Sequence, residues 1–332
     1  MRLSSYPETA SRAEEAYAAA LRPRRPSALA WPQKQFYAFH YNGIRNWFER
    51  HPDRIAVAWN GLNGLRRIFM DAARDAGART LYFELAPFKG RITCDPVGVN
   101  QANGLPRTAE FYLDWMTRST AQADEWRRYR TNIAQRVPAH AKPDGTAQAK
   151  PAGPYLFAPL QVPGDSQLRL FGGRFRTVPD FIEALICAAE ALPEGWHLKI
   201  KEHPTSPISF ADRLVGRSQR VILDNRSDTF ALVDGSAGVV TVNSSVGLEA
   251  MFFDKPVVAC GECFWAIPGV AETASDPAAL AAAFTQPEAW SFSSVARGAF
   301  LTYLLDEYYV STDGTSAEGE KIRRRLVRDN WP

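Results

Sequence analysis

Residues 197–204, His197-Leu-Lys-Ile-Lys-Glu-His-Pro204, decide the fold class of this chain together with residues 239–249, Val239-Val-Thr-Val-Asn-Ser-Ser-Val-Gly-Leu-Glu249. In the first stretch an apolar run predicts a buried strand, and the His-Pro pair falls where that strand gives way to a loop. In the second, a strand is followed by polar residues that cap the start of a helix. Ligands of open α/β sheets collect at the carboxyl ends of parallel strands, so we expect the two stretches to line one crevice.

Polar residues at these two strand ends suit a phosphate group. Asn243, Ser244 and Ser245 supply hydroxyls and free amide donors at a helix start, where anions are favoured. Each motif also has a plain structural explanation, because His-Pro often only ends a strand and Ser-Ser is often only a cap. Their combination favours a nucleotide-sugar site.

Strands alternate with helices over the second half of the chain, which predicts a parallel, doubly wound sheet. The expected strands are 155–160, 197–201, 220–223, 238–242 and 256–260, and the expected helices are 178–192, 228–233 and 246–252. An earlier βαβ unit, with strands 55–59 and 80–85, indicates a second Rossmann-like domain. We therefore expect an α/β protein in which two Rossmann-like domains face a central cleft.

Composition divides the chain into five segments. Residues 1–30 form a leader with a helix capped by Ser11, 31–136 an N-terminal Rossmann-like acceptor-side domain, 137–153 a linker rich in Pro, Ala, Lys and Gly, 154–293 a C-terminal nucleotide-sugar-binding domain, and 294–332 two helices that could cross back to the N-terminal domain.

The composition is that of a soluble globular protein. The 332 residues are 45% hydrophobic and 23% charged, which excludes disordered and fibrous classes, and the net charge of +3 does not indicate a nucleic-acid partner. A solvated helix face is the simpler explanation of two basic clusters, but they could also meet an anionic membrane surface. The clusters are Arg22, Arg24 and Arg25 near the start and Lys321, Arg323, Arg324, Arg325 and Arg328 near the end.

No stretch approaches the roughly 20 apolar residues of a membrane span, and residues 1–30 lack the apolar core of a signal peptide. We therefore expect a cytoplasmic protein, peripheral to the inner membrane if its basic ends bind lipid. Cys260-Gly-Glu-Cys263 has metal-ligand spacing, but no second Cys or His pair follows nearby, so we predict no metal site.

Two carboxylates are candidates for chemistry. Asp165, in Gln161-Val-Pro-Gly-Asp165-Ser-Gln167, follows the first strand of the second half, and the preceding glycine lets the backbone approach a ligand. Glu84 ends a strand of the first half, and facing Asp165 across the cleft it would complete a pair suited to glycosyl transfer. Pro-Gly-Asp-Ser is equally ordinary turn chemistry.

Three further charged residues are candidates for binding. Lys199 and Lys201 share one strand face and could neutralise a phosphate or carboxylate, although exposed lysines on an edge strand look the same. Glu249 could accept hydrogen bonds from ribose hydroxyls or pair with a surface cation.

These residues resemble those of the bacterial capsular polysaccharide synthesis and export family, whose characterised members are retaining β-Kdo transferases that use CMP-Kdo. The similarity extends from Ile55 to Gly269, with order and spacing agreeing throughout. Its matching stretches are Val57-Ala-Trp-Asn-Gly61, Tyr82-Phe-Glu84, Asp95-Pro-Val-Gly-Val-Asn100, Pro159-Leu-Gln-Val-Pro-Gly-Asp165-Ser-Gln, Lys201-Glu-His203-Pro204, Asn243-Ser-Ser-Val-Gly-Leu-Glu249-Ala, Lys255-Pro-Val-Val and Phe264-Trp-Ala-Ile-Pro-Gly269.

The resemblance implies a GT-B-like fold and transfer of Kdo, or a related 2-keto sugar acid, from a CMP-activated donor to a lipid-linked acceptor in capsule linker synthesis, without a cofactor or metal. By position, His203-Pro204 and Ser244-Ser245 are implied to hold the CMP phosphate. The remaining implied roles are nucleophile for Asp165, acid/base partner for Glu84 and ribose contact for Glu249. We also expect Gln161, Lys199, Lys201 and Asn243 to bind the donor.

The chain departs from the family after Glu84, where Ala86 and Lys89 replace the usual glycine and proline. Its length matches the short, single-module members, which start the linker on a lipid. Two alternative functions stay open because fold does not fix function. One is a nucleotide-sugar epimerase or hydrolase of GT-B-like plan, and the other is a non-catalytic capsule-assembly or export protein that binds nucleotide or glycan.

Overall fold

The structure is a computed structural model that describes residues 5–20, 29–121, 125–134 and 153–327. The chain divides into two compact units. Unit 1 comprises Met1–Pro106 and Glu307–Pro332, and unit 2 comprises Arg107–Asp306. Almost all of the predicted linker lies outside the described residues.

The boundary between the units differs from the predicted domain limits. Helix α4 (Ala109–Arg118), expected in the N-terminal domain, belongs to unit 2 because it packs against α12 (Ser294–Tyr303). The ring of Tyr112 lies edge-on to those of Phe300 and Tyr303, with centroids 5.0 and 5.3 Å apart. Aromatic packing between segments that are distant in sequence therefore sets this limit, which composition does not reveal.

A six-stranded, all-parallel sheet forms the centre of unit 2, in the order β6-β5-β4-β7-β8-β9. Its strands are β4 (Tyr155–Pro159), β5 (His197–Lys201), β6 (Val221–Leu223), β7 (Gly238–Thr241), β8 (Val257–Ala259) and β9 (Glu272–Thr273). Counted along the chain, the order is third, second, first, fourth, fifth, sixth, which is that of a dinucleotide-binding Rossmann domain. The strand order reverses between β4 and β7, the point at which such sheets bind ligands.

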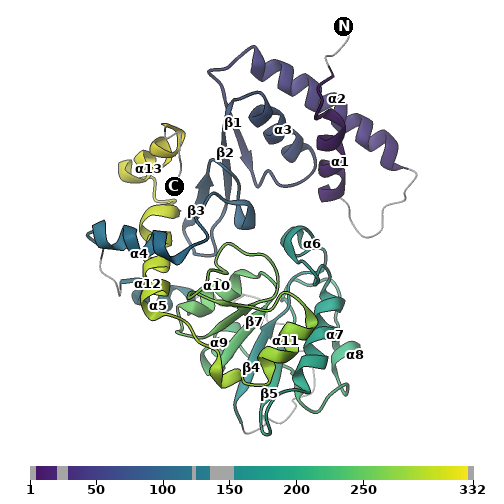
Figure 1. Cartoon of the computed structure of the whole chain (residues 1–332), viewed down its shortest axis with the longest axis vertical. Helices are drawn as coiled ribbons and strands as arrows, with labels where there is room; N and C mark the ends of the chain where they lie inside the picture. Colours follow the sequence, from purple (N-terminus) through teal and green to yellow (C-terminus); the bar gives the residue numbers. More distant parts are fainter. Residues whose placement is uncertain (1–4, 21–28, 122–124, 135–152, 328–332) are drawn as a thin grey trace. The chain divides into compact units, whose positions relative to one another are not determined.

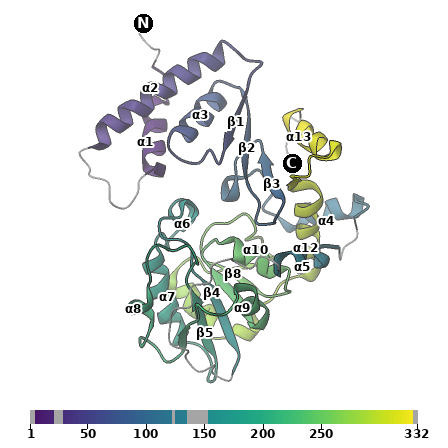
Figure 2. The same ribbon diagram turned by 180° about the vertical axis from the view of Figure 1, so that it is seen from behind.

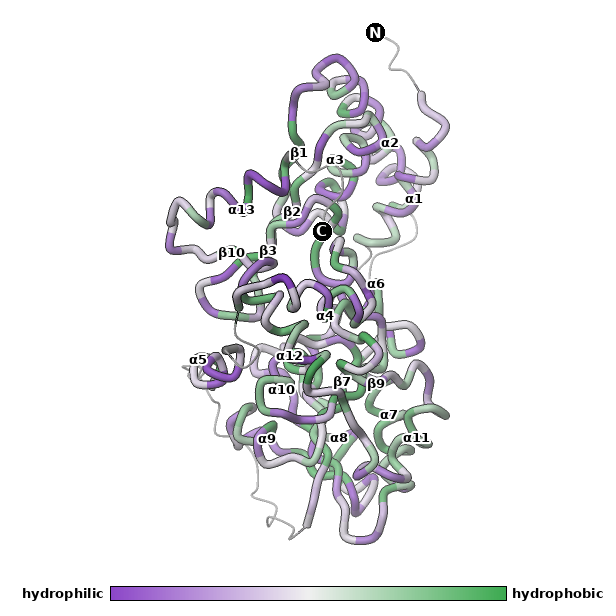
Figure 3. The backbone as a smooth tube through the Cα atoms, turned by 60° about the vertical axis from the view of Figure 1, so that its left-hand side comes forward, coloured by the Kyte–Doolittle hydropathy of each residue, from purple (hydrophilic) through white to green (hydrophobic). Residues whose placement is uncertain are grey.

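Helices cover both faces of this sheet (Figures 1 and 2). α7 and α11 pack together on one face, and α9 and α10 lie on the other. The core is apolar, with Leu156, Leu198 and Val240 fully buried, and Figure 3 shows β7 as hydrophobic. Besides α4 and α12, the helices of unit 2 are α5 (Arg130–Ala134), α6 (Ser166–Phe171), α7 (Val178–Ala189), α8 (Ala211–Leu214), α9 (Thr229–Gly235), α10 (Ser245–Met251) and α11 (Pro277–Phe284). The predicted parallel, doubly wound sheet is confirmed.

The sheet of unit 1, in the order β1-β2-β3-β10, is mixed rather than purely parallel. β1 (Ile55–Trp59) and β2 (Arg79–Leu85) are parallel and are joined through α3 (Gly64–Asp75), as predicted. β3 (Arg91–Asp95) and β10 (Val310–Ser311) each run antiparallel to their neighbours. Only residues 86–90 join β2 to β3, and so short a connection cannot make the crossover that a parallel pair needs.

Helices cover both faces of this smaller sheet as well. α1 (Thr9–Ala20), α2 (Ala30–Glu49) and α3 pack on one another, and α3 lies against β1 and β2. α13 (Ser316–Val327) closes the other face, where Ile322 and Leu326 pack against the cluster of Leu81, Cys94 and Val310. The sequence did not predict α2, whose start at Leu29 has no side-chain cap.

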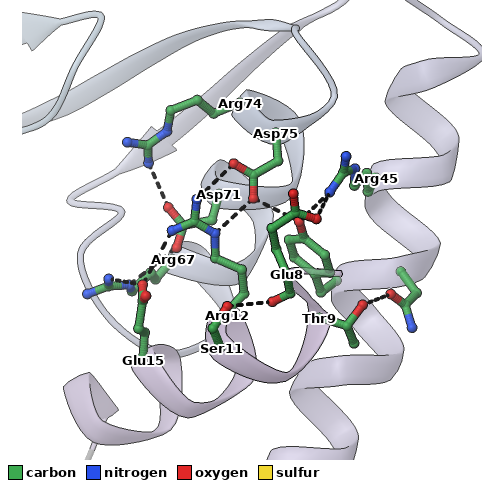
Figure 4. Close-up of polar contacts among 12 residues, drawn as sticks. Glu8, Thr9, Ser11, Arg12, Glu15, Arg45, Arg67, Asp71, Arg74 and Asp75 are labelled. Carbon is green, nitrogen blue, oxygen red and sulfur yellow. Dashed lines mark hydrogen bonds and ion pairs between the residues drawn. The ribbon is translucent and has the colours of Figure 1, made fainter. Parts of the chain in front are cut away.

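A polar network fastens the predicted leader helix to the rest of unit 1 (Figure 4). The guanidinium of Arg12 donates two hydrogen bonds of 2.8 Å to the carboxylate of Asp75, which also accepts from the hydroxyl of Tyr41 at 2.8 Å. α1 begins at Thr9, so Ser11 lies within its first turn, where its hydroxyl donates to the carbonyl of Glu8 and does not cap the helix. The helix of the predicted leader is therefore an integral part of unit 1.

Candidate functional site

Two strand-end loops meet at the reversal of strand order in unit 2. Gln161 follows β4, and its amide nitrogen donates to the Asn243 side-chain oxygen, after β7, at 2.9 Å. The backbone N–H of Asn243 donates back to the Gln161 side-chain oxygen at 3.4 Å. Gln161 is buried, so this pair of hydrogen bonds is shielded from water. Two of the predicted donor-site residues therefore lie in direct contact.

Asp165 lies in the same loop as Gln161 and caps α6. One carboxylate oxygen, Oδ1, accepts from the backbone N–H of Gln167 at 2.8 Å. The other, Oδ2, accepts a longer bond of 3.3 Å from the Gln161 amide. Asp165 thus has the ordinary turn and cap role considered for it. The cap fixes Oδ1, whereas the longer hydrogen bond holds Oδ2 more weakly.

His203 comes two residues after the end of β5 and is close enough to Asp165 for their charges to interact. Partial desolvation lowers the pKa of the imidazole, and the negative charge of Asp165 opposes that shift. The backbone N–H of Thr205 donates to Nδ1 at 3.2 Å, so Nδ1 is an acceptor and the neutral ring carries its proton on Nε2. His203 and the neighbouring Pro204 are both exposed.

The helix start after β7 has the predicted capping chemistry. The hydroxyl of Ser244 accepts from the N–H of Val246 at 3.3 Å, and Ser245 is the exposed first residue of α10. The Asn243 amide nitrogen donates to the carbonyl of Gln167 at 3.0 Å, which ties the β7 loop to α6. Glu249 lies one turn after Ser245 and is only 3% exposed.

Lys199 and Lys201 contact other residues than those grouped around Asp165. Both are buried, so they are not the exposed edge-strand lysines of the simpler interpretation. The Lys199 ammonium lies 4.0 Å from the centre of the Tyr155 ring. Lys201 donates to the carbonyls of Asn225 and Ser227 at 3.0 and 2.8 Å, and burial lowers its pKa against the pull of nearby aspartates. Lys201 therefore stabilises the loop that joins β6 to α9.

Glu84 lies in unit 1, at the carboxyl end of β2. The Asn60 amide nitrogen donates to Glu84 Oε2 at 2.6 Å, and the N–H of Leu85 donates to Oε1 at 2.9 Å. Asn60 has a left-handed φ of 65°, and its own side-chain oxygen accepts from the N–H of Leu62 at 3.2 Å. That Glu84 and Asp165 form a pair of carboxylates stays a prediction.

Asn60 is a residue that the sequence interpretation missed. An Asn-Gly pair directly after a strand is a signal for left-handed backbone, and it could have indicated a fixed amide at this strand end. Near Glu84, the substituted family positions differ in exposure, since Ala86 is buried and Lys89 is exposed.

A family model described as capsule polysaccharide biosynthesis protein matches residues 135–313, more than half of the chain. The chain belongs to this family. The stretch that matches contains every predicted donor-site residue of unit 2, from Gln161 to Glu249. The family predicted from the sequence is confirmed.

Two curated relatives match this chain over only part of their own length. Protein FixF of Sinorhizobium fredii is 29% identical over 259 residues, which cover 77% of this chain and 60% of FixF. The capsule polysaccharide export protein KpsS of Escherichia coli is 28% identical over 125 residues, which cover 35% of this chain and 32% of KpsS. The matched parts therefore span less than two thirds of either relative.

The fold is similar to that of a solved structure of Thermosulfurimonas dismutans KpsC, named as a beta Kdo 2,7 transferase. The TM-score is 0.51 at 14% identity, and the match covers 84% of this chain and 89% of the KpsC chain. This similarity confirms the GT-B-like α/β fold class. Within the described residues, no helix is both long and apolar enough to cross a bilayer.

Proposed function

We propose that this protein is a glycosyltransferase that moves Kdo, or a related 2-keto sugar acid, from a CMP-activated donor to a lipid-linked acceptor in capsule linker synthesis. The transfer retains the anomeric configuration and uses no metal ion. Membership of the capsule polysaccharide biosynthesis family and the fold shared with KpsC support the proposal. We place the protein in the cytoplasm, peripheral to the inner membrane.

The observation that carries the proposal is the Gln161–Asn243 pair at the reversal of strand order, beside Asp165. The pair fixes the loops after β4 and β7 against each other. The carboxylate of Asp165, the imidazole of His203 and the starts of α6 and α10 then lie at one end of the sheet, where open α/β sheets bind nucleotides.

In the proposed reaction Asp165 Oδ2 attacks the anomeric carbon of the sugar. The bond from that carbon to the CMP phosphate oxygen breaks, and CMP leaves with the electron pair. An acceptor hydroxyl then attacks the same carbon, its proton passes to Glu84, and the bond to Asp165 breaks. Two displacements at one carbon give net retention.

The donor nucleotide is assigned to the β5 and β7 strand ends. His203 would donate from Nε2 to a phosphate oxygen, and Ser244 and Ser245 would add hydroxyl and backbone donors at the start of α10. These donors stabilise the charge that develops on the departing phosphate. Lys201 acts indirectly by fixing the β6 loop. Glu249 is assigned to donor binding by its place in the family motif, and Lys199 is assigned to it by its place on β5.

The test is intact-protein mass spectrometry and product analysis after incubation with CMP-Kdo and a glycolipid or phosphatidylglycerol acceptor panel. Asp165→Asn should abolish both the covalent sugar adduct and transfer, because an amide cannot form the glycosyl ester. Asparagine is an equally good helix cap, so α6 should keep its start.

Asp228→Asn is the matched control. Asp228 caps α9 as Asp165 caps α6, accepting from the N–H groups of Phe230 and Ala231 at 2.9 and 3.0 Å. This control should transfer normally. Full transfer by Asp165→Asn refutes the nucleophile assignment. Release of free sugar without any need for acceptor favours the epimerase or hydrolase alternative, and nucleotide binding without product favours the non-catalytic one.

A further inference from the structure

The solvent side of α2 carries a stripe of exposed aromatic side chains. Phe36, His40, Gly43 and Trp47 follow the i, i+4, i+7, i+11 spacing of one helix face, and Phe39 lies beside them. The exposed fractions are 48% for Phe36, 60% for Phe39 and 46% for Trp47, and Trp31 near the helix start is 71% exposed. We call Phe36, Phe39, His40, Gly43 and Trp47 the outer face of α2.

The opposite side of α2 is firmly held. Tyr37, Tyr41 and Phe48 are buried against the other helices and the sheet of unit 1. The two cations within the helix turn to α1: Lys34 pairs with Glu14 at 2.5 Å, and Arg45 with Glu8 at 2.6 Å. The outer face therefore lies on the side of α2 opposite to these buried residues and ion pairs.

The charge of this helix suits an anionic surface. Residues 30–48 contain no aspartate or glutamate. His40 packs edge-on to Phe36 with ring centroids 4.3 Å apart, and His51 stacks on Trp47 at 4.4 Å. The exposed Arg50 follows the helix at its carboxyl end. The exposed Glu49 at the end of the helix pairs with Arg45 at 3.2 Å, and none of the five residues of the outer face is acidic. An anion that approaches the outer face thus meets imidazoles and the guanidinium of Arg50.

The basic cluster near the carboxyl end of the chain offers less free charge than its sequence suggests. Lys321 pairs with Glu318 at 2.9 Å, and Arg323 pairs with Glu320 at 2.5 Å. Arg325 is 2% exposed and donates to backbone carbonyls of β3 and of the residues before β10. α13 therefore uses these cations within unit 1, and the arginines at 22, 24, 25 and 328 lie outside the described residues.

We propose that the outer face of α2 binds the surface of an anionic phospholipid bilayer. Tryptophan and phenylalanine rings are favoured at the boundary between headgroups and acyl chains, and a helix that lies in this plane buries one aromatic side while cations beside it meet lipid phosphates. Here the neighbouring cation is Arg50, because Lys34 and Arg45 pair with glutamates on the other side. From Phe36 to Trp47 the outer face is about 17 Å long at 1.5 Å per residue, enough for about two lipid headgroups side by side. The inference concerns attachment and does not depend on which sugar is transferred.

The test is vesicle flotation of the full chain with phosphatidylcholine vesicles that contain or lack phosphatidylglycerol. The double variant Phe39→Gln/Trp47→Gln should bind the mixed vesicles at least about tenfold more weakly than the wild type, because two rings no longer leave water. The matched control Ile208→Gln/Val295→Gln removes two exposed apolar side chains of unit 2, 53% and 69% exposed, and should bind as the wild type does.

The salt dependence of vesicle binding distinguishes attachment through the outer face of α2 from attachment through the basic ends of the chain. Binding through buried rings should be weaker in molar salt but not lost, because salt screens the attraction of Arg50 to lipid phosphates and leaves the burial of the rings, whereas binding by exposed cations alone should be lost. Equal flotation of both double variants overturns the proposal. It is also overturned if the wild type does not float, or if the α2 variant only changes the oligomeric state seen by sedimentation, since the face would then join two copies of the chain. Transfer to a soluble acceptor, measured on the same variants, tests the proposed function separately.

Discussion

Replacing Arg12 by methionine tests whether the polar network makes the leader helix part of unit 1. The change removes two charge-assisted hydrogen bonds of 2.8 Å to Asp75, and methionine keeps the apolar stem and the helix propensity. The side chains of Arg12 and Asp75 are 26% and 14% exposed. The pair therefore lies between a surface ion pair and a buried one.

The expected cost follows from that position. Exposed pairs contribute about 0–1 kcal/mol, and breaking a buried pair costs about 3–5 kcal/mol. Asp75 would still accept from the Tyr41 hydroxyl at 2.8 Å, so it would not be left without a partner. We expect Arg12→Met to lower the free energy of unfolding of unit 1 by about 2–3 kcal/mol at pH 7.

The effect should depend on pH. Burial alone would raise the pKa of Asp75, but the hydrogen bonds from Arg12 and Tyr41 outweigh it and hold the pKa below its usual value. A carboxylate with a lowered folded pKa contributes stability that is complete above its unfolded pKa, about 3.9, and is lost as the pH falls through the folded pKa. The gap between wild type and Arg12→Met should therefore be full at pH 7 and should narrow below about pH 4.

The assay combines urea unfolding with amide hydrogen exchange on α1, because the two units need not unfold together. A double-mutant cycle with Asp75→Asn should give a coupling energy of at least about 1 kcal/mol. Arg118→Met is the control, since Arg118 and Asp114 form a pair in which both side chains are 69% exposed, and little change is expected. A loss no larger than that of the control, or one that is the same at pH 7 and well below pH 4, refutes the reasoning.

Three further predictions concern the site. Gln161→Leu should lower the free energy of unfolding of unit 2 by about 1–2 kcal/mol in urea unfolding, because it removes the hydrogen bonds to Asp165 and Asn243. If both the stability and the affinity for CMP stay unchanged, the Gln161–Asn243 contact does not have the proposed importance. The pKa of His203 is lowered in the free protein, and a bound phosphate should raise it. Calorimetry should therefore show that a non-titrating cytidine phosphodiester binds more tightly as the pH falls from 8 to 6. If His203→Gln shows the same pH dependence of binding, that dependence comes from another group. Asn60→Gly keeps the left-handed backbone but removes the hydrogen bond to Glu84, so kcat should fall by about tenfold with little loss of stability. Asn60→Ala should lose the same kcat and should also be less stable, because alanine is strained in left-handed backbone. A normal kcat in both variants argues against a role for Glu84.

Much of the nucleotide-binding unit could be predicted from the sequence. The strand 197–201 has the predicted bounds, and the strands at 155, 221, 238 and 257 differ from prediction by a residue or so at their ends. These are buried strands of a parallel sheet, in which apolar runs and polar residues at the carboxyl ends give a strong local signal. The same signal placed Gln161 and Asn243 at strand ends, where the structure brings them together.

Other features left no such signal. The 20-residue helix α2 has no side-chain cap, and its aromatic residues on both sides hide the helical period. The antiparallel strands β3 and β10 of unit 1 were not predicted, and the five-residue connection between β2 and β3 sets the direction of β3. The limit of unit 2 at Arg107 depends on rings that meet from positions 112 and 303.

Local apolar patterns and fixed motif spacing were enough to predict the family, the fold class and the strand ends that carry the donor-site candidates. Which of those candidates touch became clear from the folded chain alone. Folding joined Gln161 to Asp165 and Asn243, turned Lys201 to the β6 loop, and gave Glu84 its partner Asn60. The direction of a side chain depends on neighbours that are distant in sequence and on the need of every buried donor for an acceptor, and neither can be read from a single stretch of chain.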